Sequence, residues 1–242
     1  MSGAVSRPAL IIERDAEGVA YASAHAFWQT IDAALTERPT VRVALAGGHT
    51  PAGMYHELVR QRPTGAVWQR LQFFFGDERA VGPEHPDSNY RMAKAAIFDH
   101  APVSPSQVHR VPGELRPLDE AARAYEKTLA GEPLDLVLLG VGADGHTASL
   151  FPDSPTLQEK GRWVLPAIAP EGNAVRERLT ITLPCIASSS EAWFLVTGAE
   201  KARVVARVLN PSDEPPLPAA LVRATRVVWF LDRAAAAGLD AP

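Results

Sequence analysis

The chain has 242 residues, 46% of them hydrophobic, and a formal net charge of -4, so it can bury a substantial core and carries no general electrostatic attraction to nucleic acid. Its single cysteine, Cys185, excludes an intramolecular disulfide and a cysteine-based zinc cluster and fits a reducing compartment, so a cytoplasmic location is expected. The first residues lack a signal-peptide core and no apolar run reaches the roughly 18 to 20 residues that span a bilayer, so no membrane partner is expected.

The chain begins with a strand, a helix and a second strand. Ala9–Glu13 is a short apolar strand candidate, and Asp15 opens a segment whose apolar residues recur at helical spacing. Val41–Leu45 then alternates like a strand. This order predicts a parallel pair of strands with a right-handed crossover.

The second strand ends in the loop AGGHTP, residues 46–51. Thr50 is expected to be the N-cap and Pro51 the first residue of a helix that continues to about Arg60. Two glycines before a helix expose backbone N–H groups at the positive end of the helix dipole, which suits an anion. The alternative interpretation is a tight turn without a ligand.

A charged loop follows the third strand candidate, Leu71–Phe75. Residues 76–89, GDERAVGPEHPDSN, carry Asp77 and Arg79 between glycines and prolines, and no regular element is expected there. The loop could simply be solvated, but its position after a strand favours function.

A Gly-rich turn follows what is expected to be the central strand, in residues 134–152, LDLVLLGVGADGHTASLFP. The run 134–139 is too short for an ordinary helix and suits a strand covered on both faces. Asp144 and His146 lie in the turn after it, where the backbone is able to pass close to a ligand. Ligands bind at this end of the strands in open α/β sheets, so the site is expected here.

The glycines of this turn match the dinucleotide fingerprint G-x-G-x-x-G, at Gly140, Gly142 and Gly145. The fingerprint should follow the first strand of a βαβ unit and open a full helix. Here the strand lies in mid-chain, and Pro152 and Pro155 interrupt any long helix. The pattern therefore disfavours a nicotinamide cofactor.

The other predicted elements continue the alternation. Helices are expected at 89–98, capped by Ser88, at 118–129 and at 199–209, strands at 163–168, 177–183, 192–197 and 226–231, and a proline-rich linker at 211–218. Lys201 falls in the first turn of its helix, where a cation is disfavoured unless an anion lies nearby, although a solvated lysine is the alternative. The whole pattern predicts a doubly wound, mainly parallel α/β sheet with helices on both faces, in one domain of residues 1–242.

Three polar loops, AGGHTP, GDER and GVGADGHTASLFP, thus follow three apolar strands, and TGAEK follows a fourth. In order and spacing they resemble the 6-phosphogluconolactonase family from about residue 10 to residue 235. The segment DGHTASLFP, 144–152, is the most specific, and RLTITLP, 178–184, is also similar. The family usually has SGGSTP in the first loop, so Ala46 and His49 depart from it, and the lost hydroxyl could change one phosphate contact.

The resemblance implies a Rossmann-like, NagB/RpiA-like fold and hydrolysis of 6-phospho-D-glucono-1,5-lactone in the oxidative pentose phosphate pathway, without a cofactor. It implies that His146 activates water, that Asp144 orients or polarises His146, and that Arg79 stabilises the oxyanion or holds the phosphate. An unperturbed imidazole, with a pKa near 6.5, is about three quarters neutral at pH 7 and can accept a proton. Asp77 is expected to position Arg79 or a sugar hydroxyl.

The substrate phosphate is expected to meet a set of backbone and side-chain donors: Gly47, Gly48, His49, Thr50, Arg178 and Lys201. No set of histidines, cysteines or carboxylates has the spacing of a zinc site, so no metal is expected. The expected partner is a small phosphorylated sugar lactone, bound by a monomer.

Two other functions fit the same pattern. One is a sugar-phosphate isomerase or deaminase of the glucosamine-6-phosphate type, in which the aspartate corresponding to Asp77 acts as a base on a sugar carbon. The other is a non-catalytic sugar-phosphate sensor, although residues 1–8 leave no room for an added DNA-binding domain and Arg79, Asp144 and His146 are all present.

Overall fold

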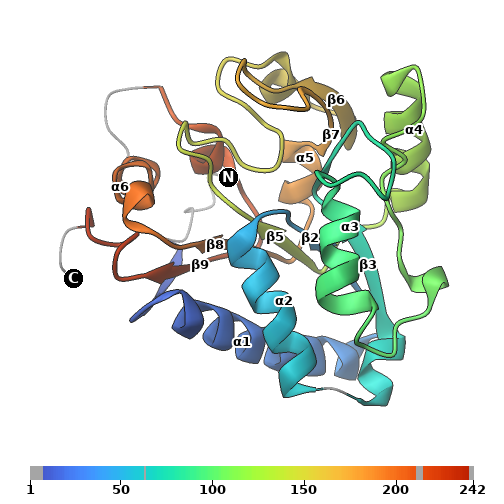
Figure 1. The fold of residues 1–242 in the computed structure, drawn as a ribbon, viewed down its shortest axis with the longest axis vertical. Helices are drawn as coiled ribbons and strands as arrows, with labels where there is room; N and C mark the ends of the chain where they lie inside the picture. Colours follow the sequence, from blue (N-terminus) through green and yellow to red (C-terminus); the bar gives the residue numbers. More distant parts are fainter. Residues whose placement is uncertain (1–7, 63, 211–214, 240–242) are drawn as a thin grey trace, which may run out of the picture.

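A six-stranded parallel sheet forms the centre of the protein, seen in a computed structural model that describes residues 8–62, 64–210 and 215–239 (Figure 1). The strands lie in the order β1-β9-β8-β5-β2-β3, and all neighbouring pairs are parallel. Their bounds are β1 Ala9–Glu13, β2 Val41–Leu45, β3 Leu71–Phe75, β5 Leu136–Leu139, β8 Glu191–Val196 and β9 Arg226–Asp232. The predicted parallel α/β sheet is therefore confirmed.

Strand β5 lies inside this sheet, between β8 and β2. All four of its residues are buried, and Leu138 pairs with Trp193 of β8 while Leu136 pairs with Val43 of β2. A strand covered by neighbours and by both faces can be apolar at every position. The prediction of a central strand in this stretch is confirmed.

Helices cover both faces of the sheet. The helices are α1 Ala16–Glu37, α2 His49–Gln61, α3 Asn89–Ala93, α4 Leu118–Leu129, α5 Leu183–Ala187 and α6 Ala202–Leu209. In Figure 1, α1, against which α2 packs, lies below the strands, and α4, α5 and α6 lie above them. No helix in the described part of the chain is long and apolar enough to cross a membrane.

A second, antiparallel sheet stands over the carboxyl ends of the parallel strands. It consists of β4 (Asp77–Arg79), β7 (Glu177–Ile181) and β6 (Val164–Ile168), in that order. The expectation that the charged loop contains no regular element was therefore wrong at its start. Gly76 joins the two sheets, because its N–H donates to Leu45 O at 2.9 Å and its carbonyl accepts from Ile181 N at 2.8 Å.

Three predicted helices differ from the structure in detail. Gly48, with φ 102°, is the N-cap of α2, so the helix begins at His49 and Thr50 is not the cap. The segment expected as one helix over 89–98 is α3 followed by a π-helical turn, Lys94–Phe98, and the predicted cap Ser88 does accept from Arg91 N. The helix expected over 199–209 begins with a 3₁₀ turn, and residues 211–214 of the predicted linker lie outside the described residues.

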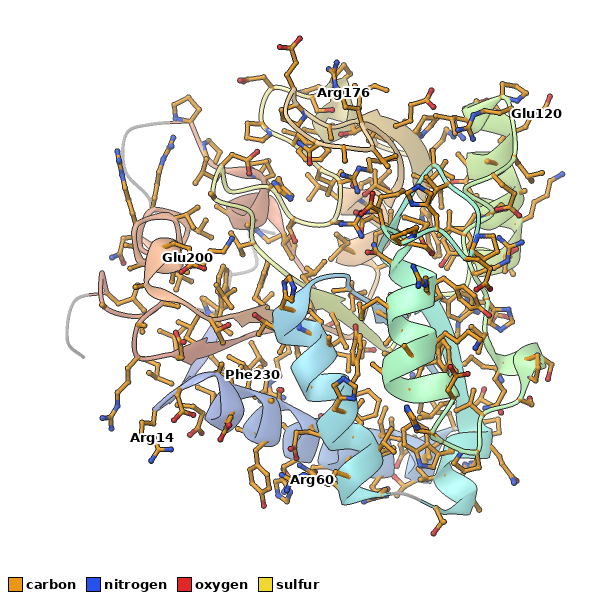
Figure 2. All side chains as sticks on the ribbon, in the orientation of Figure 1. Arg14, Arg60, Glu120, Arg176, Glu200 and Phe230 are labelled. Carbon is orange, nitrogen blue, oxygen red and sulfur yellow. The ribbon has the colours of Figure 1, made fainter. Side chains whose placement is uncertain are left out.

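One hydrophobic core runs through the molecule and includes residues of both sheets, among them Val164, Leu179 and Ile181 of the small sheet. Figure 2 shows charged side chains at the outside of the molecule, whereas Phe230 of β9, which is 1% exposed, lies inside. The small sheet is therefore packed onto the same core as the parallel sheet.

Two buried tyrosines hold the strand ends from which the site loops emerge. The Tyr55 hydroxyl donates to Ala46 O at 2.8 Å and accepts from Ala46 N at 2.9 Å. In the same way, the Tyr125 hydroxyl donates to Phe75 O at 3.0 Å and accepts from Phe75 N at 2.7 Å. Each hydroxyl thus satisfies the N–H and C=O of one buried residue at the end of a strand.

We expect Tyr55→Phe and Tyr125→Phe each to lower the free energy of unfolding by about 1–3 kcal/mol, because each leaves buried backbone groups without a partner. Urea unfolding followed by circular dichroism measures the loss. Tyr21→Phe is the matched control, since Tyr21 is 53% exposed, and we expect a change within about 0.5 kcal/mol. Equal effects in all three variants would contradict the role given to the two hydroxyls.

Candidate active site

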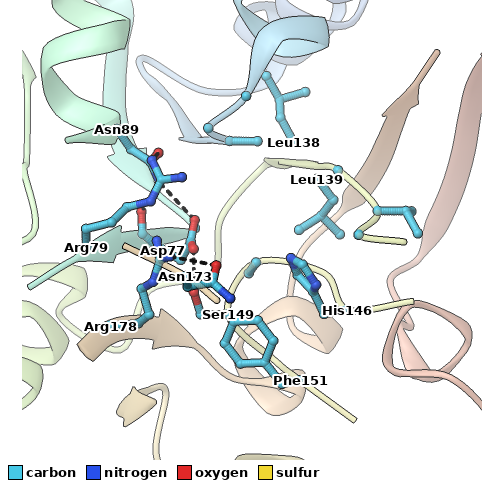
Figure 3. A pocket seen from close by; sticks show the side chains of 18 of the residues that line it. Asp77, Arg79, Asn89, Leu138, Leu139, His146, Ser149, Phe151, Asn173 and Arg178 are labelled. Atoms are coloured by element: carbon cyan, nitrogen blue, oxygen red, sulfur yellow. Dashed lines mark hydrogen bonds between the residues drawn. The ribbon is translucent and has the colours of Figure 1, made fainter. Parts of the chain in front are cut away.

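A pocket of about 350 Å³ opens where the carboxyl ends of β2, β3 and β5 meet the small sheet. Its lining includes seven of the ten residues expected from the sequence, namely Gly47, Gly48, Asp77, Arg79, His146, Arg178 and Lys201. Figure 3 shows Asp77, Arg79, Asn89 and Arg178 gathered on one side and His146 standing apart from them. The chain therefore brings a cationic side and an imidazole into one pocket.

The turn after β5 fixes the imidazole of His146. Gly142 N donates to His146 O and Gly145 N to Gly142 O, both at 2.9 Å, and Gly145 takes φ 84°. The Asp144 carboxylate accepts from His146 N at 3.1 Å and contacts His146 Nδ1 at 2.6 Å. Phe151 flanks the ring, with 4.8 Å between centroids.

The contact with Asp144 distinguishes the two ring nitrogens of His146. In the neutral imidazole, a proton on Nδ1 donates to the carboxylate and leaves the Nε2 lone pair free to accept a proton. Burial acts to raise the pKa of Asp144, but the hydrogen bond and charge of His146 and further backbone N–H donors outweigh it, so this pKa is lowered. Asp144 therefore stays ionised beside the ring.

Two arginines form the cationic side of the pocket. Arg79 of β4 and Arg178 of β7 are paired directly across the small sheet, an arrangement that like-charge repulsion disfavours and that the negative charges of nearby carboxylates, Asp77 foremost, partly offset. Burial lowers the pKa of Arg178, and the charge of Arg79 lowers it further. The Nε of each guanidinium is buried and has no hydrogen-bond partner in the protein.

Asp77 is held by donors on both carboxylate oxygens. Ser149 Oγ donates to Oδ2 at 2.6 Å, and Asn89 Nδ2 donates to Oδ1 at 3.0 Å. The hydroxyl of Ser149 and the amide of Asn89 hold the carboxylate in one orientation. The Asp77 carboxylate is therefore less free to move than a carboxylate that has to reach a carbon atom of the substrate and act as a base.

The first loop places Gly47 and Gly48 against the pocket, but not the next two residues. His49 is exposed at the start of α2, and Thr50 Oγ1 hydrogen-bonds Thr197 Oγ1 at 2.8 Å. The backbone N–H groups of His49 and Thr50 belong to the first helical turn, where no carbonyl of the same helix can accept from them. These two residues therefore have backbone donors without a partner in the helix, next to Gly48, but neither residue is part of the pocket lining.

Lys201 reaches the pocket from the 3₁₀ turn that follows β8 and precedes α6. Its Nζ donates to Val141 O at 2.8 Å, which ties the ammonium to the Gly-rich turn that carries His146. With Arg79 and Arg178 it gives the lining three permanent cations against one carboxylate, Asp77. This local excess of positive charge suits an anionic ligand although the whole chain is acidic.

The sequence analysis missed three polar residues of the lining: Asn89, Ser149 and Asn173. Asn173, in the loop between β6 and β7, accepts from Arg178 Nη2 at 3.4 Å. Ser149 lies within the DGHTASLFP segment, and Asn89 follows a predicted helix cap, so neither had a pattern of its own. Among the described residues, no group of three or more histidines, cysteines and carboxylates is arranged to hold a metal ion.

Comparisons with known proteins found similar sequences over most of the chain. The family model described as "Glucosamine-6-phosphate isomerases/6-phosphogluconolactonase" matches residues 14–229. The 6-phosphogluconolactonase of Synechocystis sp. is 36% identical, with 86% of this chain and 89% of that protein covered. The human 6-phosphogluconolactonase is 39% identical, with 85% and 83% covered.

Solved structures show the same fold. The 6-phosphogluconolactonase from Trypanosoma brucei superposes with a TM-score of 0.88 at 28% identity, covering 97% of this chain and 99% of that one. A monomeric glucosamine-6-phosphate deaminase superposes with a TM-score of 0.84 at 24% identity, covering 95% of this chain and 99% of that one. The second likeness concerns the fold alone.

Proposed function

Since the chain belongs to the family of glucosamine-6-phosphate isomerases and 6-phosphogluconolactonases, we propose that it hydrolyses 6-phospho-D-glucono-1,5-lactone to 6-phospho-D-gluconate, in the oxidative pentose phosphate pathway. The observation that carries the proposal is the presence, in one pocket, of His146 paired with Asp144 and of three cationic side chains. Lactone hydrolysis requires an activated water and a stabilised oxyanion, and the phosphate requires cations.

His146 is the residue we propose for proton transfer. Its Nε2 takes a proton from the attacking water as the water oxygen bonds to the lactone carbonyl carbon. The tetrahedral oxyanion then collapses, the bond to the ring oxygen breaks, and the imidazolium returns its proton to that oxygen. Asp144 holds the Nδ1 side throughout and stabilises the transient positive charge.

The phosphate is proposed to bind at the first loop and the cations around it. Backbone donors of Gly47, Gly48 and His49, at the N-terminus of the 13-residue helix α2, supply uncharged N–H groups. The remaining proposed donors are the side chains of Thr50, Arg178 and Lys201. Arg79, which also lines the pocket, serves either this phosphate or the oxyanion.

The competing function is proton transfer at a sugar carbon, as in the deaminases of the family. In that function Asp77 would be the base, but here donors from Ser149 and Asn89 hold both of its oxygens, which supports a positioning role. Incorporation of solvent deuterium at carbon 2 of a hexose phosphate would favour the competing reaction.

We also propose that residues 1–242 act as one domain and as a cytoplasmic monomer that does not bind nucleic acid. The shared core of the two sheets and the family match over 14–229 support one domain. The single cysteine, Cys185, which is free and buried, fits a reducing compartment, and the net charge of -4 disfavours nucleic acid.

We expect the purified protein to open freshly generated 6-phosphogluconolactone far faster than water does. Excess 6-phosphogluconate dehydrogenase converts the product with formation of NADPH, whose absorbance reports the rate after the spontaneous rate is subtracted. A rate equal to the spontaneous one would reject the proposed function. Tight binding of 6-phosphogluconate without turnover would instead indicate a sensor.

A further inference from the structure

Glu78 is a buried carboxylate that stands beside the pocket without lining it. It is 2% exposed, and because side chains alternate along a strand, it points to the opposite face of β4 from its two neighbours. Its Oε1 accepts from the backbone N–H groups of Arg79 and Asn89, both at 2.8 Å. Its Oε2 accepts from the Ser88 hydroxyl and from Tyr90 N, both at 2.9 Å.

These four bonds tie strand β4 to the start of α3. Burial raises the pKa of Glu78, while its four hydrogen bonds act to lower it, so the carboxylate depends on these donors to remain buried. Three of the donors belong to residues 88–90, which lie ten to twelve positions further along the chain. A single side chain therefore sets where this segment lies relative to β4.

The segment that Glu78 holds presents Asn89 to the pocket. Asn89 Nδ2 donates to the backbone O of Asp77 at 2.9 Å and to its carboxylate at 3.0 Å, and Asn89 Oδ1 accepts from Arg79 Nη1 (Figure 3). Gly47 of the first loop leaves room for this amide, because a Cβ there would lie 2.1 Å from Asn89 Oδ1. Asn89 thus contacts both pocket residues of β4 and the first loop.

We propose that Glu78 is a positioning residue, which fixes Asn89 and, through it, the orientation of Asp77 and Arg79 in the pocket. Glu78 touches neither the substrate nor the reacting atoms, and the kinetic form of the proposal rests on the lactone hydrolysis proposed above. Glutamine at position 78 would have one oxygen that can accept hydrogen bonds and one NH2 group that can only donate. The four donors that now bond the two carboxylate oxygens would therefore face a single acceptor atom. At least one backbone N–H would lose its acceptor, and the segment carrying Asn89 would shift.

A kinetic double-mutant cycle tests this. We expect Glu78→Gln and Asn89→Ala each to lower kcat/KM by about tenfold or more, because a shift of about 1 Å in a positioning group can cost about 100-fold. If Glu78 acts through Asn89, the loss of kcat/KM in the double variant is no larger than the loss in Asn89→Ala alone. Losses that multiply would mean that the two residues act independently and would overturn the proposal.

A second buried carboxylate is the matched control for loss of stability. Asp135 is 9% exposed and accepts from Arg42 N at 2.7 Å and from the Arg38 guanidinium, but it precedes β5 at the opposite end of the sheet. We expect Asp135→Asn to lower the Tm and keep kcat/KM within about twofold at temperatures where it is folded. If Glu78→Gln behaves in the same way, its role is only structural.

Two further measurements apply if Glu78→Gln does not fold or if the wild-type protein is inactive. Ser88→Ala removes one of the four donors to Glu78, together with the side-chain cap that accepts from Arg91 N, and is expected to give a smaller loss of kcat/KM than Glu78→Gln, so it serves if Glu78→Gln fails to fold. If the wild-type protein has no lactonase activity, the proposed function fails, and crystal structures of wild type and Glu78→Gln decide the inference. An Asn89 amide that keeps its contacts with Asp77 in the variant would overturn it.

Discussion

Replacement of His146 by alanine is expected to lower kcat by about 10²- to 10⁴-fold, the range that a general acid–base group contributes. The side chain is the imidazole of the pocket, and its contact with Asp144 at 2.6 Å leaves Nε2 free for the water. The proposed phosphate donors lie on other elements, so product binding should change little. The variant should therefore lose catalysis rather than affinity.

The coupled NADPH assay measures the loss in kcat, and calorimetric titration with 6-phosphogluconate measures binding. His100→Ala is the control, because His100 is an exposed histidine outside the pocket and should leave both quantities unchanged. Turnover retained by His146→Ala would remove His146 from the mechanism. Equal losses of turnover and product affinity would mean that the imidazole mainly binds the ligand.

The elements of the parallel sheet could be predicted because their patterns are local. An apolar run such as 134–139, followed by glycines, indicates a buried strand whatever its partners are. The site followed from the same pattern, since parallel strands bring their carboxyl ends to one edge. For this reason Asp77 and His146, which belong to loops far apart in sequence, were expected in one place, and both line the pocket.

What was missed depends on contacts between distant residues. Strand β4 has only three residues, all charged, and it is a strand because Asp77 and Arg79 pair with Thr180 and Arg178 of β7. No period can be read from three residues, so the segment resembled a solvated loop. The tyrosine hydroxyls that hold the strand ends, and the carboxylate of Glu78, likewise have partners that no spacing in the sequence reveals.

The start of α2 shows a different limit. Thr50 before a proline is a common N-cap pattern, and the helix nevertheless begins one residue before it, at His49. Gly48 adopts φ 102°, which turns the chain out of β2 directly into the helix, and the Thr50 hydroxyl instead bonds Thr197. A tertiary hydrogen bond has replaced the local one.

The second large effect is expected at a residue without a side chain. Gly142→Ala should lower kcat/KM by about 100-fold or more, because a Cβ there would lie 2.1 Å from His146 Nδ1 and 2.7 Å from the Asp144 carboxylate. The backbone itself does not require glycine, since Gly142 is not among the residues with positive φ. The added methyl group must therefore displace the imidazole or the carboxylate.

The His146 side chain is 33% exposed, so it can swing towards solvent, and we expect Gly142→Ala to keep the Tm of the wild type within a few degrees. Gly161→Ala is the control, because its Cβ would meet only Glu159, at 3.8 Å. The double variant Gly142→Ala, His146→Ala should be no slower than His146→Ala alone, since the methyl group acts by moving a ring that is then absent. Near-normal turnover by Gly142→Ala would show that the Asp144–His146 geometry is not what the reaction requires.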